Sequence, residues 1–195
     1  MQRGCPPGAG IPFALSGPEG CVMRAANEHG FTLVELLIVV AVIGIVSAVA
    51  IPGMQRAKMV GNEAAAIASL RSITSAQSNY STGCGQGGYA TSLTILGAPC
   101  AGGTQGFISP DLNPATPGVT VLGAGIMKSG YDVQLAGSGA VGPNDMSGNA
   151  TNNDYLATAA PLQVGATGQR GFRAQAGGTI FVDPAGGIAG TIPLQ

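Results

Sequence analysis

The residue with the most evident chemistry is a glutamate at the start of a long apolar segment. Glu35 is the single charged residue between Phe31 and Ile51, a run of 21 residues that is long enough to cross a bilayer as a helix. A carboxylate inside an apolar span is costly and usually functional, with a cationic partner close by. Glu35 also lies near the beginning of the expected helix, where a negative charge suits the helix dipole. Both interpretations can hold together.

The element that must carry Glu35 is a single long helix. The apolar run continues into an alanine-rich stretch, and together they predict a helix from about Phe31 to about Thr82, roughly 78 Å long at 1.5 Å per residue. Because proline removes a helix hydrogen bond, we predict a helix break at Pro52, as a kink or local melting between Gly44 and Gly61. Beyond it, apolar residues spaced by three or four predict an amphipathic face made of Val60, Ala64, Ile67, Leu70, Ile73, Gln77 and Tyr80. The charged residues of this stretch fall largely off that face: Arg56, Lys58, Glu63 and Arg71.

The chain after Gly83 is rich in glycine and proline, which predicts short strands joined by turns and irregular loops. Alternating side chains predict a strand at Lys128–Leu135, and further strands are predicted at Asp154–Ala160 and Thr179–Val182. The polar segment Gly137–Asn153 is interpreted as a mobile hairpin connection. The face of the first strand that turns inward comprises Tyr131, Val133 and Leu135.

The residues around the start of the apolar run carry a resemblance to a known family. Gly30, Phe31, the glutamate Glu35 and the unbroken apolar helix resemble the processing site of type IV prepilins. This superfamily includes type IV pilins, type II secretion pseudopilins and competence pseudopilins, which share the motif. The resemblance implies that a membrane peptidase cuts after Gly30 and that the new amine of Phe31 is methylated. It also implies an α+β fold, in which a long N-terminal helix packs on a small antiparallel sheet.

The resemblance gives Glu35 a specific role in assembly. In such filaments the carboxylate pairs with the N-terminal amine of a neighbouring subunit and sets the stagger between subunits, although its own Phe31 amine is a second candidate. The implied partners are copies of the chain, other pilins, a prepilin peptidase that is also the methyltransferase, an inner-membrane assembly platform and, before assembly, the lipid bilayer.

The segment before the apolar run is expected to be a leader, residues 1–30. Met23 would begin a short basic leader containing Arg24, so we expect translation to start there; the alternative is a long leader. Positive charge before the span predicts a cytoplasmic N-terminus and a head on the other side of the membrane. The resemblance implies that the single span crosses the bacterial inner membrane and that the head is periplasmic or extracellular.

The expected layout therefore has four parts. Residues 1–30 form the prepilin leader, residues 31–52 the transmembrane and assembly helix, residues 53–82 its amphipathic half, and residues 83–195 a glycine-rich β head. The expected function is a structural subunit of a type IV pilus-like filament. Alternatives are a pseudopilin of a type II secretion system and, with less support, a minor competence pilin that binds DNA.

Cysteines and carboxylates in the head suggest further chemistry. Cys84 and Cys100 lie beyond the membrane, in an oxidising compartment, so a disulfide is favoured over free thiols or a metal site; it would contribute roughly 3 kcal/mol. Asp145 and Asp154 lie in an Asn/Asp-rich segment and are weak candidates for calcium, but a solvated turn explains them better. No cofactor is otherwise expected.

Composition argues against two other functional classes. Charged residues are 9% of the chain and the net charge is −1, so no specific nucleic acid is expected as a partner. The small basic–aromatic patch of Arg170, Phe172 and Arg173 is the sole argument for DNA binding. His29, the single histidine, precedes the cleavage glycine, so the mature chain would have no histidine base and is not expected to be an enzyme.

Overall fold

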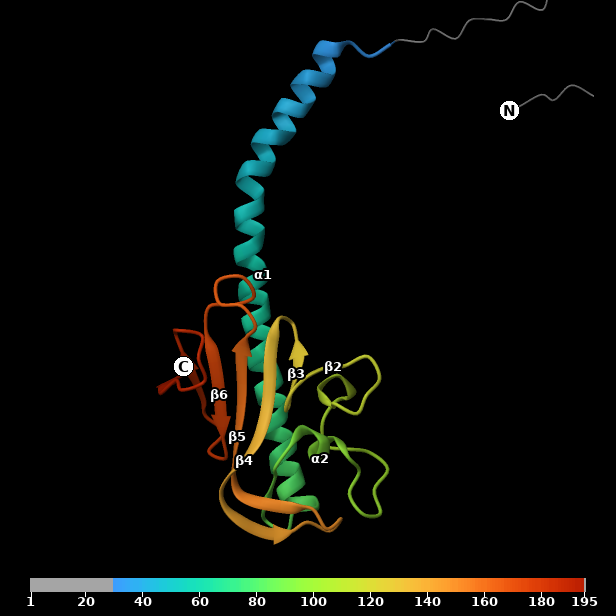
Figure 1. Ribbon diagram of the computed structural model, residues 1–195, viewed down its shortest axis with the longest axis vertical. Coiled ribbons are helices and arrows are strands. Elements are labelled where there is room, and N and C mark those ends of the chain that lie inside the picture. The colour runs from blue at the N-terminus through green and yellow to red at the C-terminus, as the bar shows by residue number, and fades with distance from the viewer. Residues whose placement is uncertain (1–29, 195) are drawn as a thin grey trace, which may run out of the picture. The chain divides into compact units, whose positions relative to one another are not determined.

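The structure is a computed structural model that describes residues 30–194 (Figure 1). The leader prediction and the start at Met23 concern residues outside this range, apart from Gly30. The chain divides into two compact units, and the second begins at Gly44. In chain order the elements are α1 Leu33–Gly83, β1 Tyr89–Ala90, α2 Leu93–Gly97, the 3-10 helix η1 Pro110–Leu112, β2 Thr120–Leu122, β3 Gly125–Lys128, β4 Tyr131–Asn144, β5 Ala150–Pro161, β6 Gly171–Gln175, β7 Ile180–Asp183 and β8 Ile192–Pro193.

The described part of the first unit is the start of α1, whose apolar side chains have no protein around them. Leu33 is 80% exposed and Ile43 is 59% exposed. Among the described residues, α1 is the one helix long and apolar enough to cross a membrane. These features fit a membrane-anchored protein with a single span, because lipid would cover the apolar side chains that the protein leaves exposed.

The predicted helix of residues 31–82 is confirmed as α1. The predicted local melting at Pro52 is wrong, whereas a kink there stays a prediction. α1 continues through Pro52 without interruption. Proline takes away the hydrogen bond that residue 52 would donate to the carbonyl of Ala48, and its ring crowds that carbonyl. A full break would free several more backbone groups, and in an apolar setting each of these costs several kcal/mol. A continuous helix with one missing bond therefore costs less than an interrupted one.

The second half of α1 packs against the sheet with a face close to the predicted one. Leu70, Ile73 and Tyr80 are buried as expected, and so is Gln77. The upper part of the face was wrong: Val60 is 66% exposed, whereas the small residues that face the sheet are Ala66, Ser69 and Ala76. In an alanine-rich helix periodicity alone places the face only approximately, because small side chains allow the sheet to approach on either side of the apolar stripe.

The head is one antiparallel sheet in the order β2-β3-β4-β5-β6-β7-β8, with β1 pairing with β5. The strands predicted from alternation are present in β4, β5 and β7, and β4 buries Tyr131, Val133 and Leu135 as expected. Strands β1, β2, β3, β6 and β8 were not predicted, since they are short or lack alternation.

Two boundaries of the predicted strands were also wrong. Lys128 ends β3 rather than beginning β4, and Ser129 and Gly130 form a tight turn with positive φ between the two strands. The segment Gly137–Asn153 is mostly strand, because β4 extends to Asn144 and β5 begins at Ala150. This segment has a low intrinsic strand propensity, but pairing between β4 and β5 compensates for it. The register of this pairing is irregular around Val141.

Candidate processing and assembly site

The proposed cleavage point lies in an open segment immediately before α1. Gly30, Phe31 and Thr32 have no regular secondary structure, and the Phe31 side chain is 86% exposed. A methyl group added to Gly30 would meet no atom within 4 Å. Nothing in the described fold therefore requires glycine at this position, and the backbone on both sides of the Gly30–Phe31 bond is accessible to another protein.

Glu35 is held at the beginning of α1 by reciprocal hydrogen bonds with Thr32. Its Oε2 atom accepts from the Thr32 amide at 3.0 Å and from the Thr32 hydroxyl at 2.7 Å, while the Glu35 amide donates to the Thr32 hydroxyl at 3.2 Å. This arrangement is a capping box, which satisfies backbone donors that a helix start leaves unpaired. The interpretation of Glu35 as a helix-start residue is confirmed, whereas its pairing with an amine stays a prediction.

Thr32 is the residue at this site that the sequence analysis missed. The signal was present, since a threonine followed three residues later by glutamate is the sequence pattern of a capping box. Cleavage after Gly30 would leave the Phe31–Thr32 peptide bond intact, so the Thr32 amide remains a donor. The capping box is consequently compatible with both the uncut and the cut chain.

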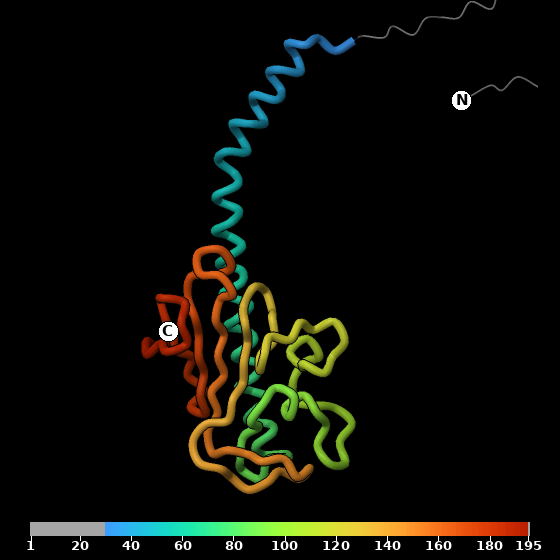
Figure 2. Tube along the Cα trace, viewed as in Figure 1, coloured from blue at the N-terminus to red at the C-terminus, as the bar shows by residue number. Residues whose placement is uncertain are grey.

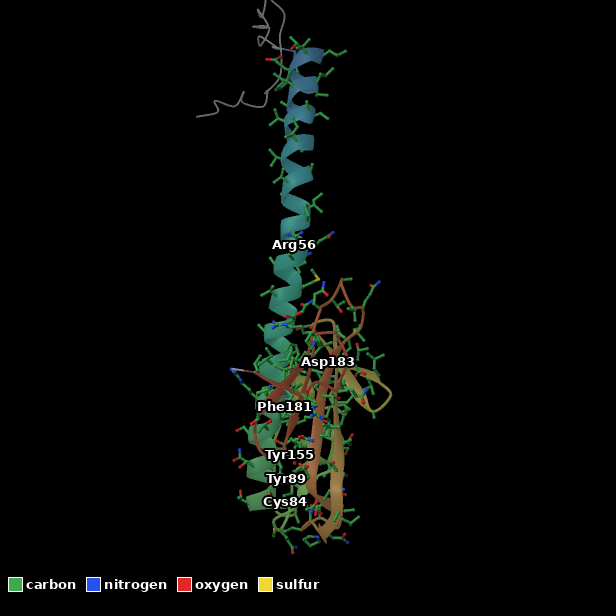
Figure 3. All side chains as sticks on the ribbon, turned by 90° about the vertical axis from the view of Figure 1, so that its left-hand side faces the viewer. Arg56, Cys84, Tyr89, Tyr155, Phe181 and Asp183 are labelled. Carbon is green, nitrogen blue, oxygen red and sulfur yellow. A yellow bond between two sulfur atoms is a disulfide. The ribbon has the colours of Figure 1, made fainter. Side chains whose placement is uncertain are left out.

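A second cluster joins the end of α1 to the head and contains the predicted disulfide. Cys84 and Cys100 form it, with their Cα atoms 6.0 Å apart, so this prediction is confirmed. Figure 3 places Cys84 at the head end of α1. The carbonyl of Cys84 also accepts a hydrogen bond from the amide of Met146 at 3.0 Å. The disulfide and the turn between β4 and β5 are therefore tied to the same point of α1.

Asp145 anchors that turn and is not arranged as a calcium ligand. Its carboxylate accepts from the Tyr80 hydroxyl at 2.7 Å, the Ser147 amide at 2.9 Å, the Asn149 amide at 2.7 Å and the Asn149 side chain at 2.9 Å. Burial alone would raise the pKa of Asp145, but these hydrogen bonds outweigh it and the pKa lies below its ordinary value. Its oxygens are occupied by donors, which leaves them unsuited to a cation.

Asp154, the other weak calcium candidate, lies elsewhere on β5. One of its oxygens accepts from the amides of Tyr155 at 2.7 Å and Ala176 at 3.1 Å. Within residues 30–194 no group of three histidine, cysteine or acidic side chains could hold a metal ion. The structure therefore gives calcium binding no support.

The predicted basic–aromatic surface patch is wrong. Phe172 is fully buried, and the guanidinium of Arg170 pairs with Glu63, with Nη2 and Oε2 2.6 Å apart. Glu63 was expected off the packed face of α1, but it is 6% exposed. Burial would raise the pKa of Glu63, yet the hydrogen bonds from Arg170 and Gln169 and the charge of Arg170 together hold it below its ordinary value.

Comparison with known proteins identifies the N-terminal motif. Residues 25–51 match the family model described as the prokaryotic N-terminal methylation motif, which is the signature of type IV pilins and pseudopilins. The match spans Gly30, Phe31 and Glu35, so the recognition made from these residues is confirmed. Neither the curated proteins nor the solved structures include a match to the chain.

Proposed function

We propose that the chain is the structural subunit of a type IV pilus-like filament. In this proposal it is cleaved after Gly30, methylated on the amine of Phe31 and polymerised through the N-terminal part of α1. The observation that carries the proposal is Gly30, which is exposed directly before a capped apolar helix and which no packing contact of the described residues requires to be a glycine. The methylation motif supports the same reading.

The proposed partners follow from the stages of this process. A prepilin peptidase would act on the open segment around Gly30, and the bilayer would hold α1 until an inner-membrane platform transfers the subunit to the filament. The N-terminus would lie in the cytoplasm and the head outside the inner membrane. The DNA-binding alternative loses its argument from sequence, because Arg170 is paired and Phe172 is buried.

Glu35 is proposed to act twice, at different stages. In the single subunit its Oε2 atom accepts both hydrogen bonds from Thr32, while no described donor reaches Oε1. The second oxygen would accept the charged amine of Phe31 from a neighbouring subunit. An isolated charge in lipid is costly and becomes tolerable beside a cation, so this pairing would favour assembly over the separate subunit.

Substitution of Glu35 separates these two roles. Glu35→Gln keeps a carbonyl oxygen for the Thr32 cap but removes the charge, whereas Glu35→Ala removes both. We expect both variants to insert into the membrane and to be cleaved, and neither to form filaments. Leader cleavage, membrane fractionation and cross-linked polymer would be measured in each. Normal polymer from Glu35→Gln would show that the cap suffices and that charge pairing is not the basis of assembly.

Cleavage is tested by a matched pair of glycine substitutions. Gly30 and Gly44 both have open space where a side chain would begin. Gly30→Val should leave an uncut membrane protein, and Gly44→Val should be cut normally. N-terminal sequencing and intact mass of the product should give a Phe31 start with an N-methyl group; any other start would refute the proposed processing.

A further inference from the structure

The connection between β5 and β6 is fastened to one place on α1. This β5–β6 loop, residues 162–170, accepts a hydrogen bond from the Asn62 side chain at the Thr167 carbonyl, at 2.8 Å. Its amides at Gln169 and Arg170 donate to Glu63 at 3.0 and 3.2 Å. The loop therefore has a defined position along the helix, which can be followed in Figure 2.

The loop is also braced internally. The Gln163 amide donates to the Thr167 hydroxyl at 3.1 Å, and the Thr167 amide donates back to the Gln163 carbonyl at 2.9 Å. Gly165, with a φ of 85°, turns the chain so that its amide bonds to the Gly168 carbonyl at 2.8 Å. The side chains that this loop exposes are consequently presented on a rigid frame.

Those exposed side chains are apolar. Leu162 is 45% exposed and Val164 is 54% exposed, and no charged residue occurs between Leu162 and Gln169. On the neighbouring stretch of α1, Val60 is 66% exposed. A braced loop that leaves two apolar side chains uncovered and contains no charge before Arg170 is suited to an environment less polar than water.

The position of the loop along α1 indicates what that environment is. The loop is the part of the head that reaches furthest along α1 toward Arg56 (Figures 1 and 3). Asn62 follows Ile51, the last residue of the apolar run, by about 16 Å of helix. Arg56 and Lys58 lie between them, about 8 and 11 Å beyond Ile51, close to the headgroup layer of roughly 6 Å per leaflet.

We propose that the β5–β6 loop rests on the phospholipid surface while the subunit is anchored in the membrane. Membrane helices are tilted by about 20° on average, and a tilt of α1 toward the loop lowers the loop to the bilayer. Leu162 and Val164 then reach the headgroup layer, and Arg56 and Lys58 pair with lipid phosphates. Apolar side chains at the interface and cations facing anionic lipid both favour such contact. The inference rests on the proposed function, because it requires α1 to anchor the chain. Its consequence is a head held at a fixed distance from the bilayer before assembly.

Single tryptophans test this contact, since the chain contains none. Val164→Trp, Val141→Trp and Val42→Trp each replace an exposed valine, in the loop, at the far end of β4 and in the apolar run. The full chain would be placed in vesicles of phosphatidylethanolamine and phosphatidylglycerol, with and without brominated acyl chains. We expect blue-shifted emission and quenching by brominated lipid for Val164→Trp and Val42→Trp. Val141→Trp should emit as in water and be quenched by iodide.

The three positions distinguish failure of this inference from failure of the anchoring. A quenched Val42→Trp with an unquenched Val164→Trp would overturn the loop contact alone, and an unquenched Val42→Trp would overturn the membrane anchor as well. Shielding of Val164→Trp that appears only in polymer would overturn the lipid contact and assign the loop to a neighbouring subunit.

The cationic part of the contact has its own control. Adding Arg56→Gln and Lys58→Gln to Val164→Trp should reduce lipid quenching in vesicles containing phosphatidylglycerol. Arg71→Gln should leave it unchanged, because Arg71 is also exposed but lies about 22 Å beyond Arg56 along α1. Equal quenching in the doubly substituted and control proteins would refute the role of the two cations.

Discussion

Replacing Glu63 by glutamine should destabilise the contact between α1 and the sheet. The carboxylate is 6% exposed and receives four hydrogen bonds. Two come from the backbone amides of Gln169 and Arg170 to Oε1, and two from the Arg170 guanidinium to Oε2, at 2.9 and 2.6 Å. Glutamine can keep the first two, but it turns an NH₂ group toward the guanidinium, so the ion pair is lost.

The size of the effect follows from exposure. Hydrogen bonds to charged groups contribute about 1.5–3 kcal/mol each when well buried. The Arg170 side chain is 46% exposed, so water can replace much of the hydrogen bonding that it loses in Glu63→Gln. We therefore expect the loss of the ion pair to lower the free energy of unfolding by about 2 kcal/mol. Glu63→Ala should cost about 4 kcal/mol, because the amides of Gln169 and Arg170 are then unpaired as well.

Urea unfolding of the purified protein in detergent micelles would measure these changes. Arg71→Gln is the control, since this exposed residue of α1 makes no salt bridge within residues 30–194, and should change stability by less than about 0.5 kcal/mol. A double-mutant cycle with Glu63→Gln and Arg170→Gln should give a coupling energy above about 1 kcal/mol. A coupling near zero would refute the idea that this ion pair holds the β5–β6 loop on α1.

Three further predictions concern the rest of the head. The pKa values of Glu63 and Asp145 lie below their ordinary values of 4.5 and 3.8. As the pH falls, the unfolded chain is therefore protonated at these two carboxylates before the folded chain is. The free energy of unfolding should therefore fall as the pH drops below about 4.5, and equal urea midpoints at pH 7 and pH 3 would contradict this. Cys84→Ser should lower stability by at most about 3 kcal/mol, and reduction of the wild type should cause the same loss. Gln77→Leu should cost about 2–3 kcal/mol, because it leaves the amide and carbonyl of Ala90 unpaired; faster hydrogen exchange at Ala90 would reveal it.

The parts of the fold that could be predicted from the sequence are those determined by local periodicity. The apolar run and the alanine-rich stretch predicted α1 almost to its last residue. The alternation of apolar and polar side chains placed Tyr131, Val133 and Leu135 on the buried face of β4. Strands such as β1 and β6 carry no comparable pattern. They exist because the edge of β5 opposite β4 offers partners to both, and such pairing joins residues far apart in sequence.

Polar residues in the core were beyond prediction for the same reason. Gln77 was placed on the packed face, but nothing local shows that its amide would pair with both backbone groups of Ala90, at 2.8 and 2.9 Å. Glu63 was placed largely off the packed face, together with the other charged residues in the second half of α1. Its partner, Arg170, is 107 residues away, so the pair becomes evident only when the sheet is in place.

The glycines show most clearly how fold and function separate in this chain. Gly85 and Gly88 follow the end of α1, and a methyl group on either would collide with neighbouring atoms, at the Gly88 carbonyl and at Thr151 respectively. Their lack of a side chain is explained by close packing within the head. Gly30 has open space around it, and its backbone does not need the left-handed region. Neither packing nor backbone conformation within residues 30–194 accounts for Gly30, and the same holds for Gly44, so open space alone assigns Gly30 no role. What connects Gly30 with the proposed proteolytic processing is its place in the methylation motif, directly before the apolar helix.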